Sequence, residues 1–203
     1  MSIVTFNPSL RVAKMHWGRA DQDVPFRGPF GVQSMNTAQP LWKVSVNFDL
    51  LEESESGEYQ SLVMQLAGAR NNLALWNVGR PTPRGTLRGS PVLSSAANPG
   101  ATSLAITAAG QAGTTLLTGD YIGVGTTYTQ QVVMVLAPVT LDGSGAGTVS
   151  IAPAIRFSQS ASSAVVWDKP TALFRQQTVS SGWEYERATA SGITLDLLED
   201  WRP

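Results

Sequence analysis

The chain has 203 residues, of which 42% are hydrophobic and only 14% are charged, whereas about 25% of the residues of a typical soluble domain are charged. Its 14 basic and 15 acidic residues leave a formal net charge of −1, which excludes a strong electrostatic field that attracts nucleic acid or an anionic membrane. The absence of cysteine excludes disulfides and thiolate metal ligands, and the length suits one large domain or two small ones.

Residues 1–40 are interrupted by four prolines and three glycines. Because these residue types break regular hydrogen-bonding patterns, we expect arms and loops with short strands here. Trp17, Phe26 and Phe30 give this segment apolar anchors, which dock either on the same chain or on a neighbouring subunit.

Two well-patterned elements follow. From Trp42 to Leu50, apolar residues occupy every second position, which predicts a strand with one buried face. Apolar residues then recur at three- and four-residue steps over 58–69, which predicts a helix with Glu58 in its first turn. A short strand is expected near Leu73.

The middle of the chain changes character. Prolines over 80–100 prevent a long helix, and we place a domain boundary in this segment. Short β-rich runs separated by glycines then predict a small barrel or sandwich over 101–157, with a hairpin turn at 140–147. The candidate strands are Ser103–Thr107, Asp120–Val124, Gln131–Val135 and Thr148–Ile151.

Longer alternation returns near the end of the chain. The closing run ITLDLLED repeats the pattern of VNFDLLEE at 46–53, so we expect two similar strand ends paired in one sheet. The predicted fold class is mainly β with one helix. Residues 1–82 plus 166–203 would form one sheet-plus-helix β domain, and 83–165 would be an inserted small β-barrel or sandwich.

Catalytic residue patterns are weak. His16 is the single histidine, and no Gly-x-Ser-x-Gly elbow accompanies it. A zinc site would have to rely on carboxylates. We therefore expect His16 to be a surface or interface residue, and we predict no catalytic residue, metal ligand or cofactor.

Acidic residues near the strand ends are candidates for the carboxylate pair of a glycosidase. Asp49 or Glu52 would meet Asp196 or Glu199 if the two similar strands are neighbours. We favour solvated strand ends and intersubunit salt bridges for these four residues. The glycines over 119–125 are followed by β-forming threonines, so they indicate a tight turn and not a phosphate-binding loop.

Arg80, Arg84 and Arg88 are spaced at four-residue intervals, but intervening prolines forbid a helical stripe. Three interpretations of this basic loop stay open, and we favour the first. The loop is solvated, or it contacts acidic groups of a partner subunit, or it faces DNA that passes through a tube. Aromatic residues of the kind that stack on bases do not interleave with it.

Several motifs in order resemble one family. The segments are WKVSVNFDLLEESESGEYQSLVMQLAGARNNLALW, PTPRGTLRGSPVL, LTGDYIGVG, VSIAPAIR and ITLDLLED. Together they are similar to distal tail or minor tail proteins of long-tailed (siphovirus-like) bacteriophages, in which a Gly-Asp-Tyr run precedes a strand and the small domain ends in Pro-x-x-Arg. Here these are Gly119 to Tyr121 and Pro153 to Arg156.

The resemblance implies a structural virion protein without enzymatic activity. It would form a ring with copies of itself, a hexamer, which joins the tail tube to the baseplate, hub or fibre proteins. Partner contacts with membrane or with specific nucleic acid sequences are not implied. The candidate interface residues are Trp17, Arg84, Arg88 and Trp201, with Trp201 as the expected anchor.

Two alternatives from other classes stay open. A carbohydrate-binding module would need exposed aromatics, for which the 101–157 unit offers Tyr121, Tyr128 and Phe157. A peptidoglycan hydrolase would need a carboxylate pair. The N-terminal segment lacks the basic start and apolar run of a signal peptide, so we expect synthesis in the host cytoplasm and assembly into the virion.

Overall fold

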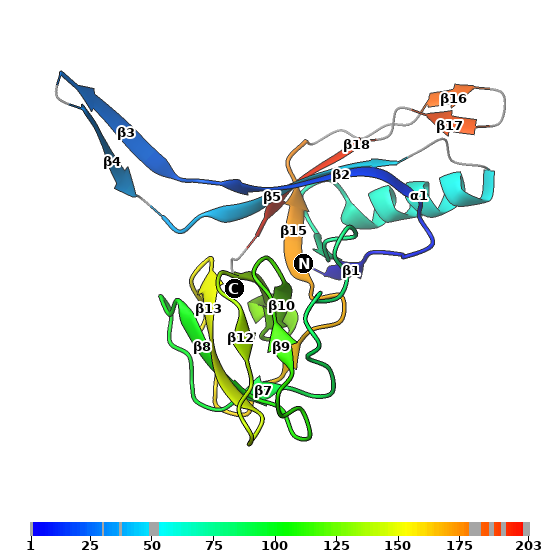
Figure 1. Ribbon diagram of the computed structural model, residues 1–203. Helices are drawn as coiled ribbons and strands as arrows, with labels where there is room; N and C mark the ends of the chain where they lie inside the picture. Colours follow the sequence, from blue (N-terminus) through cyan, green and yellow to red (C-terminus); the bar gives the residue numbers. More distant parts are fainter. Residues whose placement is uncertain are drawn as a thin grey trace.

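The computed structural model describes residues 2–29, 31–36, 38–48, 53–178, 184–186, 189–191 and 194–200. The protein is mainly β with one α-helix in the described part, as the sequence predicted. Figure 1 shows an open sheet with the helix α1 beside it, a second β-unit below, and a long arm that projects from the sheet. No α-helix among these residues is long and apolar enough to cross a membrane.

The open sheet is built from both ends of the chain. In spatial order its strands are β1 (Ile3–Thr5), β6 (Asn72–Leu75), β15 (Ala172–Gln176), β18 (Thr194–Glu199), β5 (Leu41–Phe48) and β2 (Val12–Ala20). Only the β1–β6 pair among these neighbours is parallel. In the β5–β18 pair, Leu195 lies opposite Val46, which confirms that the two similar sequence runs pair in one sheet.

The alternation predicted for the strand at 42–50 is confirmed over β5, where Val44 and Val46 are fully buried. The two ends of β5 meet different neighbours. Phe48 lies with its ring centroid 5.2 Å from that of Tyr59 in the helix, whereas Trp42 lies 6.0 Å from Tyr121 of the second β-unit. The helix and the second unit therefore cover opposite ends of one apolar sheet face.

The helix α1 spans Glu53–Leu66, so it begins five residues before the predicted start and Glu58 is not in its first turn. The serine- and glycine-containing segment before Glu58 was expected to be a loop. Acidic residues at the start favour the helix dipole, and burial of the apolar face outweighs the roughly 1 kcal/mol cost of a glycine. Left-handed backbone at Ala67 and Gly68, with φ of 47° and 67°, ends the helix.

The expectation of arms and loops with only short strands over residues 1–40 is wrong in part. β2 has nine residues, and an arm of two further strands follows it. A β-bulge between Val12 and Lys14 shifts the register and hides the alternation in the sequence. Beyond the bulge, Met15 and Trp17 share one face of β2, and pairing with β5 stabilises a strand that contains Gly18.

The second β-unit is a six-stranded barrel. Its strands, in spatial order, are β14 (Val165–Val166), β10 (Tyr121–Val124), β11 (Gln131–Val135), β13 (Ala146–Ala152), β8 (Ser103–Thr107) and β7 (Val92–Leu93). A β-bridge from Val92 to Ala164 joins β7 to the β14 side of the sheet. The bond from Leu93 N to Ser163 O, at 2.9 Å, reinforces this closure. The barrel therefore pairs its own edges and encloses a separate hydrophobic core.

Tyr59 provides a test of the core beneath the open sheet. Its side chain is fully buried, and its hydroxyl has no hydrogen-bond partner among the described residues. Burial raises the pKa of Tyr59 from its ordinary value near 10 to about 12. The folded protein therefore holds this proton more tightly than the unfolded chain, and the associated stability is complete below pH 10 and is lost as pH rises from 10 to 12.

At neutral pH we expect Tyr59→Phe to leave the free energy of unfolding unchanged or to raise it by up to about 1 kcal/mol, because the substitution removes an unsatisfied buried hydroxyl. The urea midpoint would then be the same or higher. Above pH 10 the variant should lose less stability than the wild type. Urea unfolding followed by circular dichroism on both sides of pH 10 measures this. Parallel loss of stability in the two proteins would contradict the assignment.

Candidate assembly interface

The arm is a two-stranded hairpin that continues the β2–β5 pair beyond the sheet. It consists of β3 (Asp23–Gly28) and β4 (Gly31–Asn36), which among the described strands pair only with one another. Figure 1 shows it extending away from both the sheet and the barrel. Every described residue of β3 is exposed. An isolated two-stranded hairpin is at best marginally stable in water, and it becomes stable when further strands or a packed element cover it.

The two faces of the arm differ in chemistry. Val24 lies opposite Met35, and Phe26 lies opposite Gln33, so these four side chains share one face. Val24, Phe26 and Met35, the apolar face of the arm, are 45%, 56% and 60% exposed. Exposed large apolar residues in contiguous groups mark interaction surfaces.

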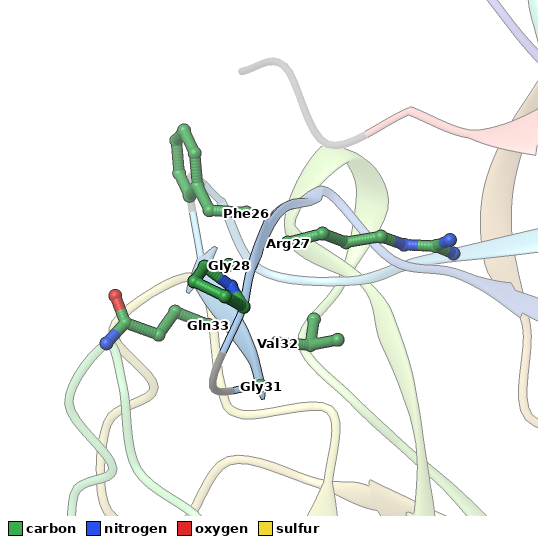
Figure 2. A pocket seen from close by; sticks show the side chains of 7 residues that line it. Phe26, Arg27, Gly28, Gly31, Val32 and Gln33 are labelled. Carbon is green, nitrogen blue, oxygen red and sulfur yellow. The ribbon is translucent and has the colours of Figure 1, made fainter.

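The opposite face of the arm carries Arg27, Val32 and Ser34. Figure 2 shows Phe26 and Gln33 on one side of the hairpin and Arg27 and Val32 on the other. The depression drawn there is lined by the residues of the arm itself, around its turn. With no wall from another element, it is unsuited to enclosing a small molecule.

Trp17, a predicted interface residue, lies at the margin of the sheet core. Its ring centroid is 5.3 Å from that of Phe174 and 5.8 Å from that of Trp42. The side chain is only partly buried, and its indole N–H has no hydrogen-bond partner among the described residues. Trp17 therefore contributes to the core of its own chain and also to the surface at the β2 edge.

The other predicted interface residues have different positions. The guanidinium of Arg84 donates to the carbonyl of Thr118, and that of Arg88 donates to the carbonyl of Gly85 at 2.9 Å. Arg88 also lies 5.0 Å from the ring centroid of Trp167. Both arginines thus hold loops of their own chain in place. Trp201 lies outside the described residues.

Sequence reasoning missed the role of the Asp in the Gly-Asp-Tyr run. Asp120 is 2% exposed, and its carboxylate accepts hydrogen bonds from the backbone N–H groups of Leu117, Arg84 and Gly85, at 2.7, 2.9 and 3.1 Å. These bonds tie the loop after β6 to the turn before β10. At Gly85 a Cβ atom would lie 2.1 Å from the carbonyl oxygen of Thr115, so only glycine permits this approach.

A buried ion pair joins the barrel to the open sheet. The Arg156 guanidinium contacts both oxygens of the Glu199 carboxylate, at 2.6 and 2.9 Å, and also donates to the carbonyl of Pro40 at 2.7 Å. The backbone N–H of Trp42 donates to Glu199 at 2.8 Å. Solvation or an intersubunit salt bridge was predicted for Glu199, and this prediction is wrong. Strand β18 places its carboxylate on the apolar sheet face, opposite Phe174.

The polar face of the open sheet does bring a histidine, a serine and an aspartate into one row. Register places His16 opposite Ser45, and Ser45 opposite Asp196. Serine is in the middle, so Asp196 lies two strands away from His16 and is not positioned to orient the imidazole as a triad requires. Within the described ranges, no group of three His, Asp or Glu side chains is positioned to hold a metal ion.

The described residues therefore define a mainly β protein with an open sheet, a barrel and a projecting arm. No protein-family model and no curated protein matches the sequence.

Proposed function

We propose that this protein is a structural subunit that assembles with copies of itself through the arm. The observation that carries the proposal is the unpartnered β3–β4 hairpin with three large apolar side chains exposed on one face. A hairpin of this kind is at best marginally stable without a partner. Burial of its apolar area against another subunit would stabilise the assembled state.

The low charge of the chain supports the same proposal. With 14% charged residues and a net charge of −1, little electrostatic repulsion opposes self-association. The resemblance of the ordered motifs to phage tail proteins suggests the setting: a ring at the tail tip, six-membered in that family, which joins the tail tube to the fibre or receptor-binding apparatus.

The carbohydrate-binding alternative is weaker. Tyr121, one of its three aromatic residues, is 8% exposed and packs against Trp17 and Trp42 at the base of the sheet. It is therefore not accessible for stacking on a sugar ring. Tyr128 and Phe157 are each partly buried, which leaves no broad aromatic platform within this pair.

A triple substitution of the apolar face tests the proposal. We expect the Val24→Ser, Phe26→Ser, Met35→Ser variant to remain monomeric at concentrations where the wild type forms rings, because the apolar area that drives association is lost. Light scattering coupled to size-exclusion chromatography measures the mass, and negative-stain microscopy shows the ring. The matched control is Met64→Ser, which replaces a 73% exposed apolar residue on the helix.

The expected pattern is loss of assembly in the arm variant and retention in the Met64→Ser protein, with equal circular dichroism spectra. Wild-type protein that stays monomeric at all concentrations, or an arm variant that assembles like the wild type, would contradict the proposal.

A further inference from the structure

The open sheet has one long free edge. β2 pairs with β5 on one side, and no described strand pairs with it on the other. It has nine residues, whereas β1 at the opposite edge has three. A free edge of this length presents a row of backbone N–H and C=O groups to which another strand can be added. The barrel offers no such edge because it closes on itself.

The apolar face of the sheet is incompletely covered at this edge. Met15 and Trp17 lie opposite Val46 and Val44 and face the same core. The two valines on β5 are 1% and 0% exposed, yet Met15 and Trp17 remain partly exposed. No residue of β2 is fully buried. What distinguishes the two strands is their position, since β5 has a neighbour on both sides and β2 has one.

The arm has the complementary pattern. Because side chains alternate along a strand, a strand added beside β2 places one of its faces over the sheet core and the other on the polar side. With β4 beside β2 and the apolar face over the core, Met35 would cover the exposed parts of Met15 and Trp17, and Phe26 would continue the same face one strand further out. Ser34 would then lie on the polar side, with His16. A one-residue slip would reverse both faces, so the register is strongly specified.

The arm cannot fill this position in its own chain. β3 begins three residues after β2 ends and continues in the direction of the β2–β5 ribbon. Folding back along β2 would require reversal of both strands within that short connection. The edge is therefore open to the arm of a second copy. Arm and edge are different surfaces, so the contact is head-to-tail, and repeating it generates a closed ring or a filament.

We propose that the arm of one copy adds to the free edge of β2 in the next copy, with its apolar face against Met15 and Trp17. The sheet then continues from subunit to subunit. This inference rests on the proposed self-assembly, and it specifies the acceptor site.

The absence of cysteine makes the test clean, because single introduced cysteines have no background. Two differently tagged full-length chains, Ser34→Cys and His16→Cys, are co-expressed and treated with a short bis-maleimide. Both residues are exposed. We expect a mixed-tag dimer in at least about tenfold higher yield than from Ser34→Cys with Met64→Cys, because adjacency raises the effective concentration from micromolar to millimolar.

Each variant is also expressed alone as a control. Dimers from His16→Cys alone would indicate symmetric pairing of two β2 edges, and dimers from Ser34→Cys alone would indicate arm-to-arm contact. The acceptor assignment is overturned if either of these single-variant dimers is the dominant product. It is also overturned if Ser34→Cys gives the same dimer yield with Met64→Cys as with His16→Cys. If negative-stain microscopy shows rings in these cases, self-assembly stands and only the acceptor is wrong. If every chain is monomeric, both proposals fail.

Discussion

Glu199→Ala is expected to lower the free energy of unfolding by about 3–5 kcal/mol, because it leaves the Arg156 guanidinium buried without its counter-charge. The two side chains are 6% and 2% exposed, and their closest N–O distance is 2.6 Å. Glu199 also accepts the backbone N–H of Trp42, so that donor loses its partner as well. Urea unfolding followed by tryptophan fluorescence measures the loss.

The matched control is Asp21→Ala. Arg19 and Asp21 form a similarly short pair, at 2.7 Å, but the side chains are 57% and 46% exposed. An exposed pair contributes about 0–1 kcal/mol, so this variant should be close to the wild type. Similar effects for Glu199→Ala and Asp21→Ala would show that burial of the Arg156–Glu199 pair has no energetic consequence.

The double variant Arg156→Met, Glu199→Met separates the cost of an unpaired charge from the value of the pair. Replacing both charged groups by apolar side chains is often neutral or stabilising. We therefore expect the double variant to be more stable than Glu199→Ala. Because the pair joins the barrel to the open sheet, a double variant that keeps its stability but changes the position of the barrel would assign Arg156 an orienting role.

The second large effect is expected at Asp120. Asp120→Ala removes the acceptor of three backbone N–H groups at the turn before the barrel strand β10. A buried donor that loses its partner costs about 1–3 kcal/mol. We expect a total loss of at least about 3 kcal/mol, since the three bonds break together. Chemical denaturation of the purified protein measures this loss.

Asp120→Asn gives the graded comparison. It has one carboxamide oxygen and keeps the side-chain shape, so it retains part of the acceptor capacity. The expected order of stability is wild type, then Asp120→Asn, then Asp120→Ala. Asp168→Ala, which removes an exposed carboxylate, should change stability by less than about 0.5 kcal/mol. Equal stability of Asp120→Ala and Asp168→Ala would contradict the anchoring role of Asp120.

The strands with clear local patterns were predictable. Ser103–Thr107 and Gln131–Val135 coincide with β8 and β11. The strand β5 was equally predictable, because apolar and polar residues alternate at consecutive positions of a strand with one buried face. The helix was found at the right place, and its start was displaced because serine and glycine do not distinguish a loop from a helical turn that packing stabilises.

The candidate site was only partly predictable. Trp17 was identified as an apolar anchor, and the structure places it at the margin of the sheet. Arg84 and Arg88 have the exposed-loop sequence of an interface, yet their guanidinium groups donate to carbonyls of the same chain. A sequence does not reveal which carbonyl lies within reach of an arginine, since that depends on how two loops meet.

The sequence by itself determined the β-rich class, the single helix and the alternating faces of the best strands, because these depend on neighbouring residues. The similar runs at 46–53 and at the end of the chain also predicted that both parts of the chain contribute to one sheet. Only the tertiary structure decided that Arg156 meets Glu199 across 43 positions and that the β3–β4 hairpin pairs with none of the other described strands. Those features depend on which distant segments come together. The periodicity of apolar residues indicates which face of a strand is buried. It does not indicate which part of the molecule covers that face.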